Sequence, residues 1–128
     1  MVRNPYYPKQ VTKYRLNPDV IDCIDFCTKN PKPMFPYLGK LKKYNMLWYV
    51  TITSYDKKFE LNVPTIEKVI SSFQKLVEKL PNSFVGWCYD PIFLTHEYII
   101  ERHLQEFEKI AKSLSGYTNT CVISFLVY

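Results

Sequence analysis

Two histidines lie seven residues apart in a stretch whose apolar residues repeat with helical spacing. His96 and His103 therefore fall near one face of the expected helix. Helices that bind zinc through two histidines place them four residues apart, as in the H-E-x-x-H pattern, and this chain has no such pair. We interpret His96 as a residue of the first helical turn and His103 as a border residue of the core.

Three carboxylates surround the loop that leads into the same helix. Asp90 follows an expected strand, and Glu97 and Glu101 lie at the expected helix start. Loops of α/β proteins often carry active sites, so an enzyme built around residues 96–101 remains one interpretation. Acidic residues also suit the positive end of a helix dipole, and we prefer this second interpretation. With three glycines and no G-x-S-x-G pattern, the sequence predicts no catalytic residue and no cofactor.

The four cysteines show neither C-x-x-C nor zinc-knuckle spacing. Residues 1–8 lack the apolar segment of a signal peptide, and no run approaches the ~20 apolar residues of a membrane span. We therefore expect free thiols, no metal, no membrane partner and a reducing, cytoplasmic location. The thiols belong to Cys23, Cys27, Cys88 and Cys121.

The positive charge is concentrated in the first third of the chain. Nine Lys or Arg and three acidic residues precede Tyr44, whereas the rest carries a net charge of −1, which gives the formal total of +5. Cations attract phosphates, and unpaired bases stack on aromatic rings, so this mixture predicts contact with DNA or RNA. The candidate nucleic-acid-binding residues are Arg3, Lys9, Lys13, Arg15, Lys32, Tyr37, Lys40, Lys42, Lys43 and Tyr44.

Two classes of function fit these features. The favoured hypothesis is a small non-enzymatic module that binds nucleic acid through its basic third, as would suit an accessory protein of a virus or mobile element. The alternative is a protein-interaction or assembly module. Such a module would recognise an acidic protein surface, or form a homodimer through an exposed sheet edge or the Tyr/Trp-rich strand.

The elements that must position these residues form one folded domain. A length of 128 residues with 47% apolar content is enough for a single core. We divide the chain into a basic, Pro/Tyr-rich extension at 1–44 and an α/β core at 45–128. The extension is expected to hold a short strand at 11–16 and a short helix at 18–29. Asn17-Pro18-Asp19 favours that helix start, and Val20, Ile24 and Cys27 would be buried.

From residue 45 the expected order is β-β-α-β-α-β. Strands are predicted at 46–54, 59–63, 83–89 and 120–128, with helices at 64–80 and 95–115. The fold class is α+β, a two-layer α/β sandwich with about four strands, two long amphipathic helices on one face and a ferredoxin-like layout. The last strand is nearly all apolar and is expected inside the sheet. The predicted core is Ile66, Ile70, Phe73, Val77, Ile100, Leu104, Phe107, Ile110, Val50, Ile52, Val85 and Ile123.

Overall fold

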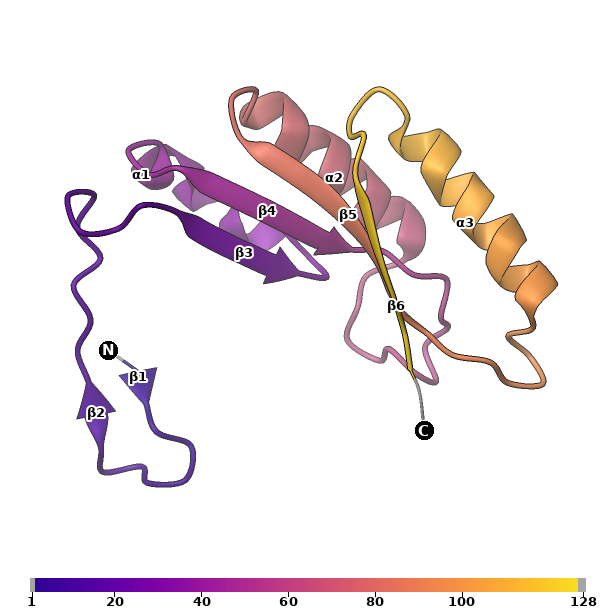
Figure 1. The fold of residues 1–128 in the computed structure, drawn as a ribbon, viewed down its shortest axis with the longest axis horizontal. Coiled ribbons are helices and arrows are strands. Elements are labelled where there is room, and N and C mark those ends of the chain that lie inside the picture. Colours follow the sequence, from indigo (N-terminus) through magenta and orange to yellow (C-terminus); the bar gives the residue numbers. More distant parts are fainter. Residues whose placement is uncertain (1, 127–128) are drawn as a thin grey trace.

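The computed structural model of the chain describes residues 2–126 and shows a four-stranded parallel sheet. Its strands are β3 (Ile24–Thr28), β4 (Met46–Thr51), β5 (Phe84–Ile92) and β6 (Cys121–Phe125). Their order across the sheet is the same as their order in the sequence (Figure 1). Each strand therefore pairs with the one that follows it in the chain.

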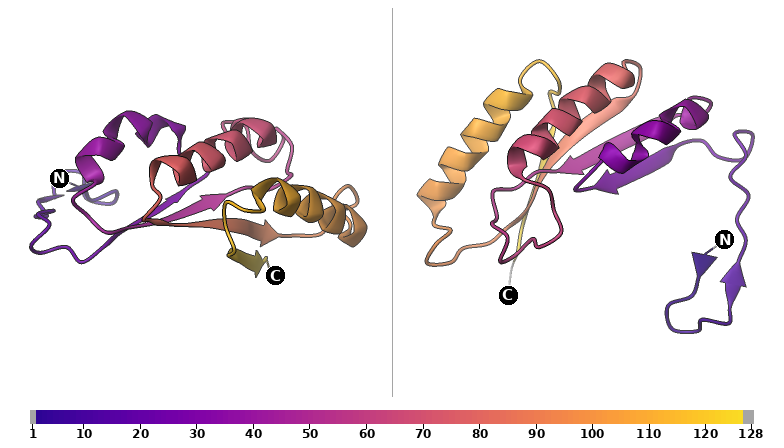
Figure 2. Two further views of the ribbon diagram at one scale, coloured as in Figure 1. Left: turned by 90° about the horizontal axis from the view of Figure 1, so that it is seen from above. Right: turned by 180° about the vertical axis from the view of Figure 1, so that it is seen from behind.

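Helical crossovers connect the parallel strands, as parallel pairing requires. A short 3-10 helix, η1 (Lys32–Tyr37), and α1 (Leu38–Leu41) join β3 to β4. The two long helices are α2 (Ile66–Lys79), between β4 and β5, and α3 (Ile100–Leu114), between β5 and β6. All of them cover the same face of the sheet, and within residues 2–126 no helix lies on the other face (Figure 2). The predicted two-layer α/β sandwich is confirmed.

The core lies between the sheet and its helices. Trp48 and Val50 of β4 alternate with outward-facing neighbours and are fully buried, as is Phe73 of α2. This confirms the predicted burial of several residues, while others pack against the core as partly buried side chains. Val50, Ile52, Phe73, Val85 and Ile110 belong to the first group, and Ile66, Ile70, Val77 and Phe107 to the second.

The predicted helix at 18–29 is wrong. The amide of Val20 donates to the carbonyl of Asn17 at 3.0 Å, which makes a turn, and Val20 remains exposed. Residues 24–28 form β3, because Ile24, Phe26 and Thr28 alternate with exposed residues in the two-residue period of a strand. Phe26 then packs on the sheet, and Cys27 lies on the exposed face rather than in the core.

The predicted return strand at 59–63 and the ferredoxin-like layout are also wrong. The amides of Phe59 and Glu60 both donate to the carbonyl of Asp56 at 3.1 Å, so this segment forms turns. Both edges of β4 are already taken, one by β3 and the other by β5. A ferredoxin-like sheet is antiparallel in part, whereas all four strands here run parallel.

The second long helix is rotated and shortened relative to the prediction. It begins at Ile100, because the hydroxyl of Thr95 accepts from the amides of Glu97 and Tyr98 in a separate turn. It ends before Gly116, whose φ of 84° is left-handed. Ile100 and Leu104, both predicted in the core, are exposed on this helix.

The last strand, β6, lies at the edge of the sheet rather than inside it. All five of its residues are exposed, including Ile123, which was predicted in the core. Residues 127 and 128 of the predicted strand lie outside the described residues. An apolar run alone therefore did not distinguish an interior strand from an uncovered edge strand.

Residues 2–23 form an extended arm that projects from the start of β3 (Figure 1). Its β1 (Val2–Arg3) and β2 (Val11–Thr12) pair antiparallel. The strand predicted at 11–16 is therefore shorter than expected and covers two residues. Throughout residues 2–126, every helix is too short or too polar to cross a lipid bilayer.

Candidate functional site

The arm displays its cations on an exposed backbone. The side-chain carbonyl of Asn4 accepts from the amides of Tyr6 and Tyr7 at 2.9 and 3.2 Å, which closes the turn after β1. This turn keeps both tyrosines in solvent, with Tyr6 86% exposed. The four predicted cations of the arm, Arg3, Lys9, Lys13 and Arg15, are all exposed.

A second basic surface, here called the platform, comprises residues 32–44 around η1 and α1. Leu38 is buried and anchors the platform on the core, while four predicted lysines stay exposed. Lys40 Nζ lies 5.8 Å from the centre of the Tyr37 ring, within the range of a cation–π contact. Tyr37 is itself 53% exposed. The lysines are Lys32, Lys40, Lys42 and Lys43.

Tyr44 joins the arm to the platform. Its hydroxyl donates a hydrogen bond to the carbonyl of Leu16 in the arm. Next to it, Asn45 Nδ2 donates to the carbonyl of Asp22 at 3.0 Å. Lys43 Nζ lies 5.5 Å from the centre of the Tyr44 ring. Tyr44 is therefore half-buried and positions the arm, whereas the sequence alone treated it as one more contact residue.

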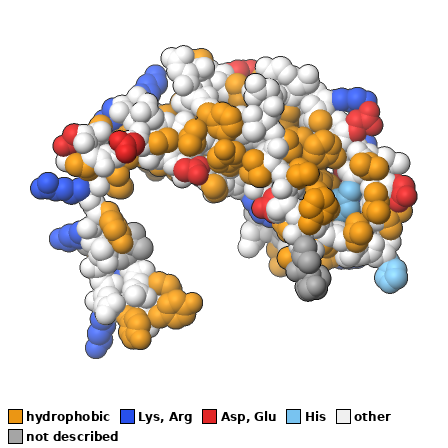
Figure 3. Space-filling model, in the orientation of Figure 1, with side chains coloured by type: hydrophobic (Ala, Val, Ile, Leu, Met, Phe, Trp, Pro, Cys, Tyr) orange, Lys and Arg blue, Asp and Glu red, His pale blue; other side chains and the backbone are white. Residues whose placement is uncertain are grey.

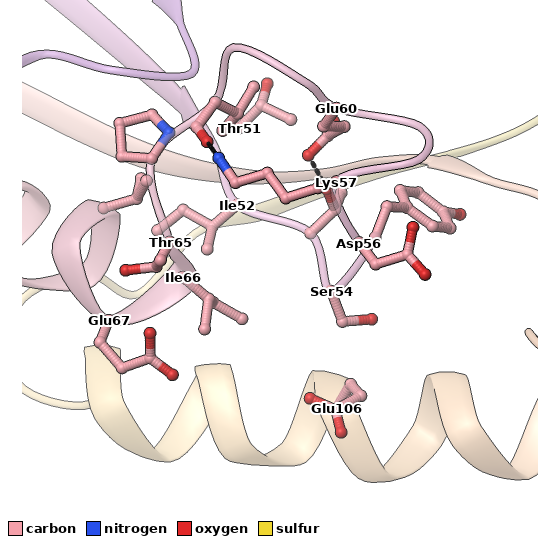
Figure 4. Close-up of a pocket in the computed structure, with 15 residues that line it drawn as sticks. Thr51, Ile52, Ser54, Asp56, Lys57, Glu60, Thr65, Ile66, Glu67 and Glu106 are labelled. Carbon is pink, nitrogen blue, oxygen red and sulfur yellow. Dashed lines mark hydrogen bonds between the residues drawn. The ribbon is translucent and has the colours of Figure 1, made fainter.

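A cavity of about 270 Å³ lies beyond the carboxyl end of β4, between the following loop and the two long helices (Figure 4). Glu67 comes from the start of α2 and Glu106 from α3. At its rim, Glu60 forms an ion pair with Lys29 and accepts from Thr53 Oγ1 at 3.3 Å. Neither histidine nor cysteine lines this cavity, so it offers no imidazole or thiol for acid–base or nucleophilic chemistry.

His103 has a structural place in the core. Its Nε2 lies 2.9 Å from the carbonyl of Phe93, and since a carbonyl only accepts, Nε2 carries the proton. The Nδ1 atom then accepts from the Tyr89 hydroxyl at 2.9 Å. Burial raises the pKa of Tyr89, which keeps that hydroxyl protonated. With both ring nitrogens occupied, His103 fixes the 93–99 loop against α3, as expected of a core histidine. The prediction for His96 is wrong, because this exposed residue lies in the loop before α3 and not in its first turn.

Each of the three carboxylates around this loop lies in a different environment. Glu97 pairs with Lys58 at 3.2 Å, and Asp90 accepts a hydrogen bond from Ser124 of the neighbouring strand. Glu101 is exposed in the first turn of α3, where it faces the positive end of the helix dipole. Glu101 therefore fits the helix-dipole interpretation, whereas Glu97 precedes α3, which begins at Ile100, and Asp90 lies within β5.

The four cysteines carry free thiols. Burial raises the pKa of Cys88 to about 11, and the neighbouring Asp90 adds to the shift. Burial also raises the pKa of Cys121. These thiols stay protonated near neutral pH and are poor nucleophiles. Within residues 2–126 no group of three His, Cys, Asp or Glu side chains is placed to hold a metal ion.

Sequence reasoning missed the grouping of residues at the carboxyl ends of the strands. Lys29 directly follows β3, and Glu60 lies in a turn after β4. The fold brings these two residues together as an ion pair. The alternation of Ile24, Phe26 and Thr28 indicates a strand in the sequence. The helix prediction gave more weight to the helix-start pattern at Asn17.

Comparison with known proteins places the chain in a family without assigning it an activity. No curated protein and no solved structure matches it. One family model, described as a domain of unknown function (DUF1848), matches residues 1–128. Because that match spans the whole sequence, the chain belongs to the DUF1848 family.

Proposed function

We propose that the protein binds nucleic acid, DNA or RNA, through the arm and the platform together. The observation that carries this proposal is the hydrogen bond from Tyr44 to Leu16, which joins two separately basic segments into one surface. The two segments that this hydrogen bond connects carry four exposed cations each. Such a surface would contact several successive phosphates.

Tyr37 supports a contact with bases as well as phosphates. Its ring is exposed, and Lys40 beside it supplies a positive charge at the distance of a cation–π pair. An unpaired base stacked on this ring would hold its phosphate near Lys40 or Lys42. A duplex offers no free base face, so the arrangement favours single strands.

The surface is not uniformly basic, which limits its expected affinity. Asp19 and Asp22 lie at the root of the arm and are exposed, so part of the positive charge is offset there. Figure 3 shows red acidic side chains beside blue ones in this region. Binding should therefore be strong only at low ionic strength, where screening is weak.

The decisive experiment measures binding of labelled single- and double-stranded DNA and RNA by fluorescence anisotropy over a range of salt concentrations. Replacing Lys40, Lys42 and Lys43 with alanine should weaken binding to all sequences and flatten the salt slope by about 2–3 units, close to one per phosphate contact. The matched control replaces Lys68, Lys75 and Lys112, three exposed lysines of α2 and α3, and should behave as the parent.

Two results would overturn the proposal. The parent protein would show no salt-dependent binding at low ionic strength, or both triple variants would lose the same affinity. Equal losses would mean that binding depends on the net charge of the protein and not on the platform, and an acidic protein surface could bind in the same way.

We further propose that the protein works in a reducing, cytoplasmic compartment, because four free thiols, two of them with raised pKa values, suit such an environment.

A further inference from the structure

A cavity of about 630 Å³, here called the platform cavity, lies where β4 and β5 begin. Its lining comes from the end of the platform, with Lys42 and Tyr44, and from the end of α2 with the turn at 81–83. Figure 1 shows α1 and the end of α2 side by side at this end of the sheet. The cavity therefore adjoins the surface that we propose for nucleic acid.

The charged side chains that line the platform cavity are cationic. Lys42 comes from the platform and Lys79 from the last turn of α2. Within residues 2–126, no aspartate or glutamate lines the cavity and neither lysine forms an ion pair. Lys79 Nζ lies 5.9 Å from the centre of the Phe35 ring, which keeps its charge beside the platform.

This charge exceeds what the fold itself requires. The carboxyl end of α2 carries a partial negative charge, and Lys79 in the last turn offsets it. Lys42 then leaves the platform cavity with an excess of positive charge. The 270 Å³ cavity at the other end of β4 has the opposite character, because Glu67 and Glu106 line it. Of these two cavities, the platform cavity is the one suited to an anion.

Apolar side chains form another part of the lining. Leu47 and Phe84 are register partners on β4 and β5, and Leu47 is 37% exposed. The Phe84 ring lies against Tyr49, with 5.5 Å between the ring centroids. Met46 and Leu80 also line the cavity and belong to the buried core. A ligand that fills this cavity therefore combines an apolar body with a negative charge.

The turn after α2 adds hydrogen-bonding side chains. Ser83 N donates to the carbonyl of Leu80 at 3.0 Å, which fixes the turn. Asn82 and Ser83 both line the cavity, and their amide and hydroxyl groups can donate and accept hydrogen bonds. Apolar walls with a few polar groups are typical of small-molecule sites, and the volume of this cavity lies in their usual range.

We infer that the platform cavity binds one unstacked nucleotide of a single strand, with the base against Leu47 and Phe84 and the phosphate between Lys42 and Lys79. The inference rests on the proposed function, because the strand reaches the cavity across the platform. A nucleotide joins a flat base to a charged phosphate, and this matches both parts of the lining. A simple anion would leave the apolar part uncovered, and an apolar ligand would leave both lysines unpaired.

Adenosine monophosphate probes the cavity without the rest of a strand. Added to isotope-labelled protein at low ionic strength, it should shift the amide resonances of Leu47, Ser83 and Phe84 in a saturable way. Adenosine and inorganic phosphate each keep only part of the contacts and should bind at least about 5-fold more weakly. A short single-stranded oligonucleotide should shift the same resonances at lower concentration, which distinguishes a nucleotide of a strand from a free nucleotide.

A nearly isosteric substitution tests the charge of the cavity. Asn82→Asp places a carboxylate in an exposed turn and should weaken adenosine monophosphate and the oligonucleotide by at least about 5-fold, with an unchanged circular dichroism spectrum. Asn62→Asp changes the net charge equally in the exposed loop between β4 and α2, and should bind as the parent. Lys79→Ala should also weaken both ligands, whereas Lys75→Ala on the same helix should not.

The outcomes separate this inference from the proposed function. If strands bind in a salt-dependent way but adenosine monophosphate gives no saturable shift, the inference is wrong and the proposed function stands. The inference is equally wrong if Asn82→Asp and Asn62→Asp behave alike, or if inorganic phosphate binds as tightly as the nucleotide. If adenosine monophosphate saturates the cavity and no strand binds, both fail, because the cavity is then a site for free nucleotides.

Discussion

The ring of Phe26 stacks on the indole of Trp48, with 4.1 Å between ring centroids and 13° between the ring planes. The two residues are register partners on β3 and β4, so this contact fixes the first strand on the sheet. Trp48 is fully buried, and Phe26 is one of the side chains that cover it. The segment at 24–28 is thus part of the same core as the rest of the chain.

Removing this contact should destabilise the whole fold. Phe26→Ala is expected to lower the free energy of unfolding by about 2–4 kcal/mol, because a stacked and partly buried ring is lost. Urea denaturation followed by tryptophan fluorescence measures the change. Asp25→Ala, on the same strand and the opposite face, should change it by about 0.5 kcal/mol or less. Equal effects of the two substitutions would contradict the observed face of β3.

Phe73 should be the costliest single truncation in α2. Its side chain is fully buried between the helix and the sheet, so Phe73→Ala should cost roughly 3–5 kcal/mol. Lys75→Ala, two residues further along the exposed side of the same helix, provides the control. A loss below about 1 kcal/mol for Phe73→Ala would mean that the helix packs through another face.

The two halves of the sequence differ in how much of the fold could be predicted from them. The apolar residues of α2 repeat with the helical period, and the helix and its buried Phe73 follow from that pattern alone. Near Asn17 a helix-start pattern stands directly before a strand pattern, and local sequence does not show which one tertiary packing selects. The stacking of Phe26 on Trp48, 22 residues away in sequence, decides it.

Ile100, Leu104 and Ile123 illustrate a second limit. Their apolar character predicts burial, and each is exposed because the surface that it faces is an edge strand or a groove without a covering layer. For the basic third, the exposure of the cations follows from composition. What composition could not show is that Tyr44 ties the two basic segments together.

The raised pKa of Cys88 should make the free energy of unfolding fall in alkaline solution. Burial raises its pKa to about 11 in the folded protein, above the ordinary value of 9.0, so the unfolded chain loses this proton first. The stabilising effect of the protonated thiol is complete below about pH 9 and declines as the pH rises toward 11. Urea midpoints measured at pH 8, 9 and 10 should fall less steeply for Cys88→Ala than for the parent. Parallel pH profiles would contradict the assignment.

Tyr37 should discriminate between single and double strands. Tyr37→Ala removes the exposed ring beside Lys40, and stacking contributes about 1–3 kcal/mol per base, so single-strand affinity should drop by at least about 5-fold. Duplex affinity should change little, because paired bases do not reach the ring. Tyr37→Phe keeps the ring and should bind as the parent does. Equal losses for both strands, or a loss with phenylalanine, would exclude a stacking role.

Tyr44 should matter through its hydroxyl rather than its ring. Tyr44→Phe retains the ring beside Lys43 but loses the hydrogen bond to the Leu16 carbonyl, which holds the arm against the platform. A hydrogen bond of this kind contributes about 0.5–1.5 kcal/mol, so affinity for a long single strand should fall about 2- to 10-fold. An oligonucleotide short enough to contact only the platform should bind parent and variant alike. Limited proteolysis should cut residues 13–16 of the variant faster, because the detached arm is more accessible. Unchanged cleavage together with unchanged affinity for the long strand would show that the two basic segments act independently.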